Sequence, residues 1–88
     1  MKVLTFGAVW CPDCIIMGPI WEEIEKENPW VVREHYDIDK DSKMAKKYRA
    51  DPIPVFVFLD KDGNEIERIQ GEVPKETLVD KLNEYKGR

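Results

Sequence analysis

The pentapeptide Trp10–Cys14, with the sequence Trp-Cys-Pro-Asp-Cys, is the stretch that decides both the fold and the chemistry of this chain. It follows Lys2–Phe6, a short apolar run that is typical of a strand, and it leads into a segment with helical periodicity. Proline is favoured at the first position of a helix, so Pro12 predicts a helix from there to about Glu27. The stretch therefore predicts a tight strand-to-helix junction that carries two cysteines.

The spacing of Cys11 and Cys14 places both on one face of the predicted helix, with Cβ atoms about 5–6 Å apart, close to disulfide geometry. Cys11 is expected at the N-cap, where free N–H groups and the helix dipole favour a thiolate. Cys14 is expected to be more shielded and to act as the resolving thiol. Asp13 suits the dipole but its charge competes with the thiolate. The pair predicts a reversible dithiol–disulfide couple.

Two other interpretations of the cysteines stay open. A CxxC pair can be half of a zinc site, but structural zinc usually takes four ligands, and this chain offers two cysteines and His35. The cysteines could also be inert and buried. We expect neither a metal nor another cofactor.

The rest of the chain predicts an α/β fold of order βαβαββα with a mixed sheet of about four strands. In the first helix, an apolar stripe of Ile16, Ile20 and Ile24, flanked by Met17 and Trp21, is expected to face the core. The later expected elements are strands at Val31–Asp37, Pro52–Leu59 and Glu65–Gln70 and helices at Asp41–Arg49, capped by Asp39 or Asp41, and Pro74–Tyr85.

The length and the net charge exclude several classes of function. The 88 residues predict one domain, residues 1–88, with a shallow surface site. A net charge of -4 argues against nucleic acid and against anionic membranes, and no apolar run is long enough to span a membrane. Without a signal-peptide pattern or a disulfide framework, the expected location is the cytoplasm, and a monomer is the simple expectation.

The cysteine motif and several distant positions resemble the thioredoxin family. Gly18-Pro19 is similar to the kink proline of that family's active-site helix, Ile53-Pro54 to its cis-proline, Gly63 to its hairpin glycine, and Gly71 to its groove glycine. The resemblance covers nearly the whole chain, but the family's opening strand and helix are missing, so the chain resembles a minimal, glutaredoxin-sized member.

The resemblance implies a thiol–disulfide oxidoreductase that reduces protein disulfides through Cys11, the nucleophile, and Cys14. It implies a shallow, apolar substrate groove formed by Trp10, Pro12, Ile53, Pro54, Gly71 and Val73. Asp13 is expected to support the site from its place between the two cysteines. One departure concerns proton transfer. Thr5 stands where thioredoxins usually carry a buried aspartate, and His35 lies near the position of its lysine partner. His35 is therefore a candidate for a proton role.

The electron donor implied by the resemblance is a flavin-dependent enzyme of the thioredoxin-reductase type. Glutathione, as in glutaredoxins, is the alternative, but their Gly-Gly-x-Asp segment is replaced here by Gly71–Pro74, and no cation flanks the cysteine motif. An alternative of another class is a non-catalytic adaptor with a thioredoxin fold that binds an extended peptide in the same groove.

Overall fold

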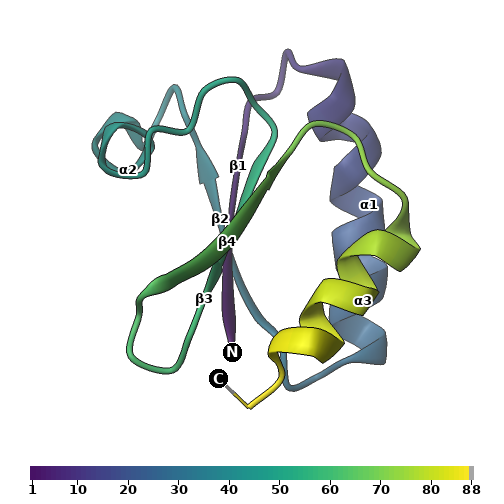
Figure 1. The fold of residues 1–88 in the computed structure, drawn as a ribbon. Helices are drawn as coiled ribbons and strands as arrows, with labels where there is room; N and C mark the ends of the chain where they lie inside the picture. The colour runs from purple at the N-terminus through teal and green to yellow at the C-terminus, as the bar shows by residue number, and fades with distance from the viewer. Residues whose placement is uncertain (88) are drawn as a thin grey trace.

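A computed structural model describes residues 1–87, which form a four-stranded sheet and three helices (Figure 1). The elements are β1 (Lys2–Gly7), α1 (Pro12–Glu27), β2 (Val32–Asp37), α2 (Ser42–Lys47), β3 (Val55–Leu59), β4 (Glu65–Gln70) and α3 (Lys75–Tyr85). The sheet order is β2-β1-β3-β4; β1 pairs with β2 in parallel, and the other pairs are antiparallel. The predicted α/β class, element order and mixed sheet are confirmed.

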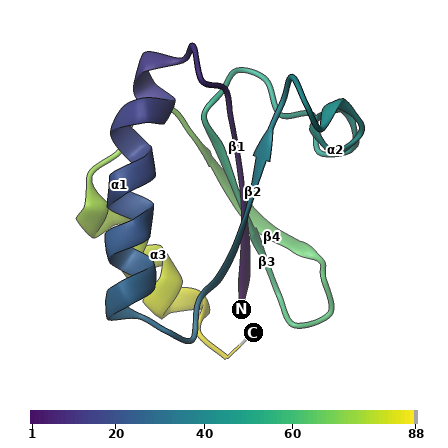
Figure 2. The ribbon, with the colours of Figure 1, turned by 180° about the vertical axis from the view of Figure 1, so that it is seen from behind.

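The helices cover the sheet on two sides, α1 and α3 on one face and α2 on the other (Figures 1 and 2). Because side chains of a strand alternate between faces, β1 contributes to two cores. Val3 packs with the α1 and α3 side chains, whereas Leu4 and Phe6 pack in the cluster beneath α2. β3 is buried along its whole length, as the continuous apolar run predicts for a central strand.

Helix α1 has the predicted bounds but a different buried face. Met17, Trp21 and Ile24 are buried, whereas Ile16 is 45% exposed and Ile20 is only partly buried. The prediction that Ile16 faces the core was wrong. The buried face is centred on Met17 and Trp21, because these side chains reach the aromatic residues of β3.

Two other elements are shorter than expected by more than one residue. The strand expected from Pro52 begins at Val55, because Pro52 and Pro54 have no N–H group to donate to the sheet. The helix expected over Asp41–Arg49 covers Ser42–Lys47. Neither proposed cap acts through its side chain: Asp41 is at the N-cap position without a capping hydrogen bond, and Asp39 has another partner.

The edge strand β4 has an irregular register. Leu59 pairs with Glu65 and Phe58 with Glu67, so Ile66 is an extra residue in a β-bulge. The bulge lets Ile66 and Ile69 both pack against the core beneath α1 and α3, although they are three positions apart in the sequence.

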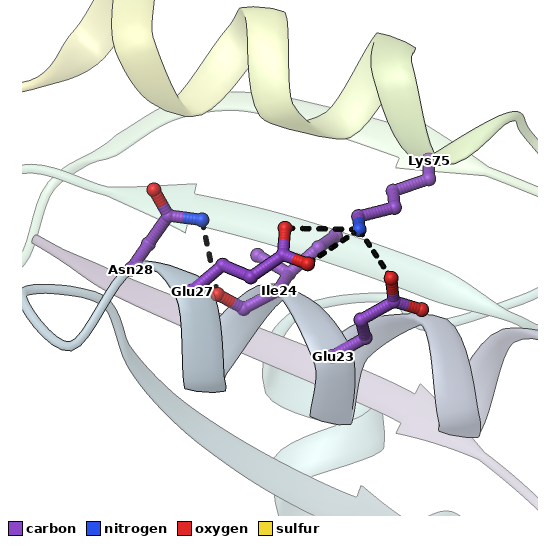
Figure 3. Close-up of polar contacts among 5 residues, drawn as sticks. All are labelled: Glu23, Ile24, Glu27, Asn28 and Lys75. Atoms are coloured by element: carbon purple, nitrogen blue, oxygen red, sulfur yellow. Dashed lines mark hydrogen bonds and ion pairs between the residues drawn. The ribbon is translucent and has the colours of Figure 1, made fainter.

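A lysine joins the two helices on this face. Lys75 Nζ, at the start of α3, lies 2.6 Å from Glu23 Oε1 and 2.9 Å from Glu27 Oε1, both on α1 (Figure 3). The pKa of the lysine is raised and that of Glu23 is lowered by this contact. The same close-up shows Asn28 Nδ2 donating to the carbonyl of Ile24, which helps to end α1.

Three loops meet at one end of the sheet. The β1–α1 loop, the segment entering β3 and the segment leaving β4 all lie at the end opposite the two chain termini (Figure 1). These loops carry the sequence-predicted site. Within residues 1–87, no helix is both long and apolar enough to cross a membrane.

Candidate active site

Cys11 is the N-cap of α1, as predicted. Its backbone is extended, with φ −90° and ψ 114°, and Pro12 takes the first helical position. The Cys11 Sγ atom accepts a hydrogen bond from the backbone N–H of Cys14 at 3.3 Å. A sulfur in this position lies against the positive end of the helix dipole, which stabilises a thiolate. The local sequence therefore provides the setting of a nucleophilic cysteine.

Cys14 lies one turn further, above Gly7 at the end of β1. A Cβ atom added to Gly7 would lie 3.1 Å from Cys14 Sγ and 3.2 Å from Cys14 Cβ, so the thiol rests against bare backbone. Burial and the hydrogen bond with Cys11 raise the pKa of Cys14 to about 12. This thiol is therefore protonated at neutral pH.

The prediction that Cys14 is more shielded than Cys11 was wrong. Cys11 is only 6% exposed, whereas Cys14 is partly exposed. The reason is a hollow of about 290 Å³ beside Cys14, between α1 and β2, which opens the resolving thiol to one side. Cys11 instead turns its sulfur back over the first turn of the helix.

Trp10 is anchored by a residue that sequence reasoning had assigned differently. Its Nε1–H donates to Asp39 Oδ2 at 2.8 Å, which ties the β1–α1 loop to the β2–α2 loop. Since β1 and β2 are parallel neighbours, the residues that follow their carboxyl ends meet at one edge. That topology was the available signal for Asp39, which we had expected as a helix cap.

The segment at Pro54 forms the other wall of the site. The Ile53–Pro54 peptide is cis, and the Pro54 carbonyl accepts from the Gly71 N–H at 2.9 Å. Pro54 is buried and lines a small space with Cys14, Trp21 and Phe56. Gly71 has φ +85°, which favours glycine over other residues. Ile53 and Val73 are half-buried on opposite faces of the sheet. Ile53 packs against the core beneath α2, and Val73 packs against the core beneath α1 and α3.

Exposed apolar side chains surround the cysteine motif. Val9 is 78% exposed, Trp10 and Ile15 are each 62% exposed, and Ile16 follows them on the first two turns of α1. Pro12 and Asp13 are also exposed. An apolar surface beside a reactive sulfur suits contact with another polypeptide. Sequence reasoning had named Trp10 and Pro12 for this surface but missed Val9 and Ile15.

His35 lies on β2 directly opposite Thr5 of β1. Thr5, which is 2% exposed, places its Oγ1 atom 2.9 Å from Nδ1 of His35. The imidazole is exposed on one side and packs against the protein on the other. Its pKa is lowered below the ordinary 6.5 by this partial burial and, to a lesser extent, by the charge of Arg33. The ring edge also approaches Gly7, since a Cβ there would lie 3.5 Å from His35 Cε1. Sequence reasoning did not single out Gly7, although both the Cys14 thiol and the His35 ring lie close to it.

Among residues 1–87, no cluster of three or more metal-ligating side chains is present. The paired cysteines at a helix start, the opposing cis-proline and the four-stranded mixed sheet together define a thiol–disulfide oxidoreductase fold and site.

Comparison with known proteins agrees with this class. A family model described as thioredoxin matches residues 1–83. Thioredoxin of Chlamydia pneumoniae is 37% identical over 85 residues, which cover 97% of this chain and 82% of that protein. Thioredoxin H5 of Arabidopsis thaliana is 34% identical over 85 residues, covering 97% and 70% respectively. The X-ray structure of Fasciola hepatica thioredoxin matches with a TM-score of 0.89 and 34% identity, covering 97% of this chain and 80% of that one.

The chain belongs to the thioredoxin family. It is a protein-disulfide oxidoreductase.

Proposed function

We propose that this protein reduces disulfides of other proteins, with Cys11 as the nucleophile and Cys14 as the resolving thiol. The observation that carries the proposal is the position of Cys11 at the N-cap of α1, with its sulfur 3.3 Å from the Cys14 N–H. A hydrogen-bond donor and a helix dipole that both point at the sulfur stabilise its anionic form.

The proposed cycle has two exchanges. The Cys11 thiolate attacks one sulfur of a target disulfide, and the other target sulfur leaves as a thiolate. Cys14 then loses its proton and attacks Cys11 Sγ, which releases the second target sulfur and leaves a Cys11–Cys14 disulfide. Two electrons have passed to the target, and an external reductant must reduce the pair again.

The substrate surface in this proposal is the exposed apolar area around the motif. An extended segment of the target would lie across Trp10, Pro12 and the loops at Pro54 and Gly71, where backbone groups can pair with it. The Trp10–Asp39 hydrogen bond supports this role, because it holds an exposed aromatic side chain beside the sulfur.

For the electron donor we propose a flavoenzyme of the thioredoxin-reductase type, acting on a monomer in a reducing compartment such as the cytoplasm. The residues that flank the cysteines, Val9, Trp10, Ile15 and Ile16, are apolar, whereas glutathione carries two carboxylates that need cationic partners. Such a surface suits a protein donor better than glutathione.

Reduction of insulin tests the proposal. The wild-type protein should accelerate insulin precipitation when a thioredoxin reductase and NADPH supply the electrons, and Cys11→Ser should abolish the effect. Turnover with glutathione and glutathione reductase alone would reverse the choice of donor. No acceleration with either system, or with dithiothreitol, would favour a non-catalytic peptide-binding adaptor.

A further inference from the structure

We propose that His35 is the general base that takes the proton of Cys14 during the second exchange, and that Thr5 is the positioning residue that holds the imidazole for this task. The inference rests on the proposed function, because it concerns the step in which Cys14 attacks Cys11.

Thr5 and His35 are register partners on parallel strands, and both face α1. Their side chains meet with 2.9 Å between Oγ1 and Nδ1. Gly7 follows two residues later on the same face of β1, beneath Cys14. Because side chains alternate along a strand, Thr5 and Gly7 lie on the same face of β1. Thr5 therefore lies beside the imidazole of His35, and Gly7 lies beneath the thiol of Cys14.

Gly7 brings the thiol and the imidazole together. A single point, the position of an added Cβ on Gly7, lies 3.1 Å from Cys14 Sγ and 3.5 Å from His35 Cε1. The thiol and the ring edge are therefore separated by no more than the sum of these distances, and both side chains line the same hollow. Any side chain at this position would fill the gap.

The hollow beside Cys14 gives this pair access to solvent. It measures about 290 Å³, and its titratable and charged lining residues are Cys14 and Glu22 from α1 and Arg33, His35 and Asp37 from β2. Arg33 disfavours a proton on the imidazole and Asp37 favours one, while β1 adds no charge on this face. Arg33 is itself paired with Glu25. A proton taken from Cys14 can leave through the open side of this hollow.

In this proposal, Nδ1–H of His35 is the donor in its contact with Thr5 Oγ1. In this tautomer the lone pair of Nε2 is free to accept the proton of Cys14. A buried hydroxyl, unlike a buried carboxylate, adds no charge beneath the cysteines. His35 stays neutral near pH 7, because burial of one ring edge lowers its pKa.

The step balances as follows. Cys14 Sγ–H gives its proton to Nε2 of His35, directly or through a water molecule, as Sγ attacks Cys11 Sγ. The new bond is Cys11–Cys14, the bond between Cys11 and the target sulfur breaks, and its electron pair leaves on the target thiolate. The imidazolium then returns its proton to that thiolate or to solvent. Concerted transfer avoids a free Cys14 thiolate, which is costly because the pKa of this thiol is about 12.

Stopped-flow reaction of the reduced protein with Ellman's disulfide separates the two exchanges. The first release of thionitrobenzoate reports attack by Cys11, and the second reports attack by Cys14. His35→Gln should slow the second release about 10-fold or more at pH 7 and leave the first within about twofold. Tyr36→Phe, on the opposite face of the same strand, is the matched control and should change neither.

The pH profile separates proton transfer from a structural effect. In the wild type, the second rate should fall as pH drops through a midpoint below 6.5, the ordinary pKa of histidine. In His35→Gln this inflection should disappear, and the rate should rise about tenfold per pH unit towards alkaline pH. Thr5→Val should weaken the step by a smaller factor, and imidazole added to His35→Ala should restore part of it.

Several results would overturn the inference. An unchanged second release in His35→Gln, an equal slowing of both releases, or a slowed release that keeps the wild-type inflection would each do so, as would no rescue by imidazole. Failure of the proposed function itself is distinguishable, because the wild-type protein would then give no second release and form no Cys11–Cys14 disulfide.

Discussion

The backbone N–H of Cys14 donates to the sulfur of Cys11 across 3.3 Å, so the first turn of α1 gives the two cysteines different surroundings. The Cys11 sulfur accepts this hydrogen bond, and it lies at the positive end of the helix dipole. Cys14 lies against Gly7 and keeps its proton, because burial and Cys11 both raise its pKa. The proposed order of the two exchanges rests on this difference.

The first prediction concerns the titration of Cys14. Cys11→Ser removes the thiol whose hydrogen bond and charge help to raise the Cys14 pKa to about 12, but it leaves the burial, which is the largest cause. The pH midpoint for alkylation of Cys14 by iodoacetamide, followed by mass spectrometry, should therefore lie below 12 and above the ordinary 9.0. A midpoint at or below 9.0 would show that burial does not act as described.

Gly7 provides the second prediction. Gly7→Ala places a methyl group 3.1 Å from Cys14 Sγ, and the resulting overpacking should lower the free energy of unfolding by about 1–3 kcal/mol and slow the second exchange. Gly18→Ala is the matched control. It adds a methyl with no atom within 4 Å inside a helix, so it should stabilise the protein by about 0.5–1 kcal/mol. Equal effects of the two substitutions in urea unfolding would contradict the close approach.

The third prediction is a pH dependence of stability. The pKa of His35 is lowered by folding, so the unfolded chain takes up a proton first as pH falls below 6.5. The stability advantage of the wild type over His35→Gln should therefore be present above pH 6.5 and shrink as the pH falls through the lowered value. Urea unfolding at pH 7.5 and pH 5 measures this advantage, and an advantage that grows on acidification would refute it.

The fourth prediction tests the lysine between α1 and α3. Lys75→Met removes the contacts with Glu23 and Glu27, and it should lower Tm by a few degrees at low salt and by less at high salt, because exposed ion pairs are screened. Lys61→Met, in the exposed hairpin turn, should change Tm little. Insulin reduction should be unaffected by both. A salt-independent loss in Lys75→Met would point to lost packing instead.

The sequence was most informative where one local rule decides the structure. Pro12 and the cysteine spacing predicted the start of α1 and the N-cap position of Cys11, and the apolar run over Val55–Leu59 predicted the central strand. Local rules did less well where contacts between distant segments decide. Ile16 is exposed because the face of α1 is chosen by the aromatic side chains of β3.

The site shows the same division. The sequence predicted the two cysteines, and the family resemblance implied the cis peptide at Pro54, but the Trp10–Asp39 hydrogen bond depends on how two loops meet. The relative exposure of the cysteines was predicted wrongly, because the hollow beside Cys14 forms between α1 and β2, which are far apart in sequence. Spacing within one helix carries no information about such a hollow.

The most direct test of the central claim is trapping of the mixed disulfide. Cys14→Ser, mixed with a protein disulfide such as insulin, should form a stable covalent complex through Cys11 that dithiothreitol reverses and that non-reducing gels and mass spectrometry detect. Cys11→Ser, which keeps the protonated Cys14 thiol, should form none at pH 7. A complex through Cys14 in Cys11→Ser, or no complex with Cys14→Ser, would contradict Cys11 as the nucleophile.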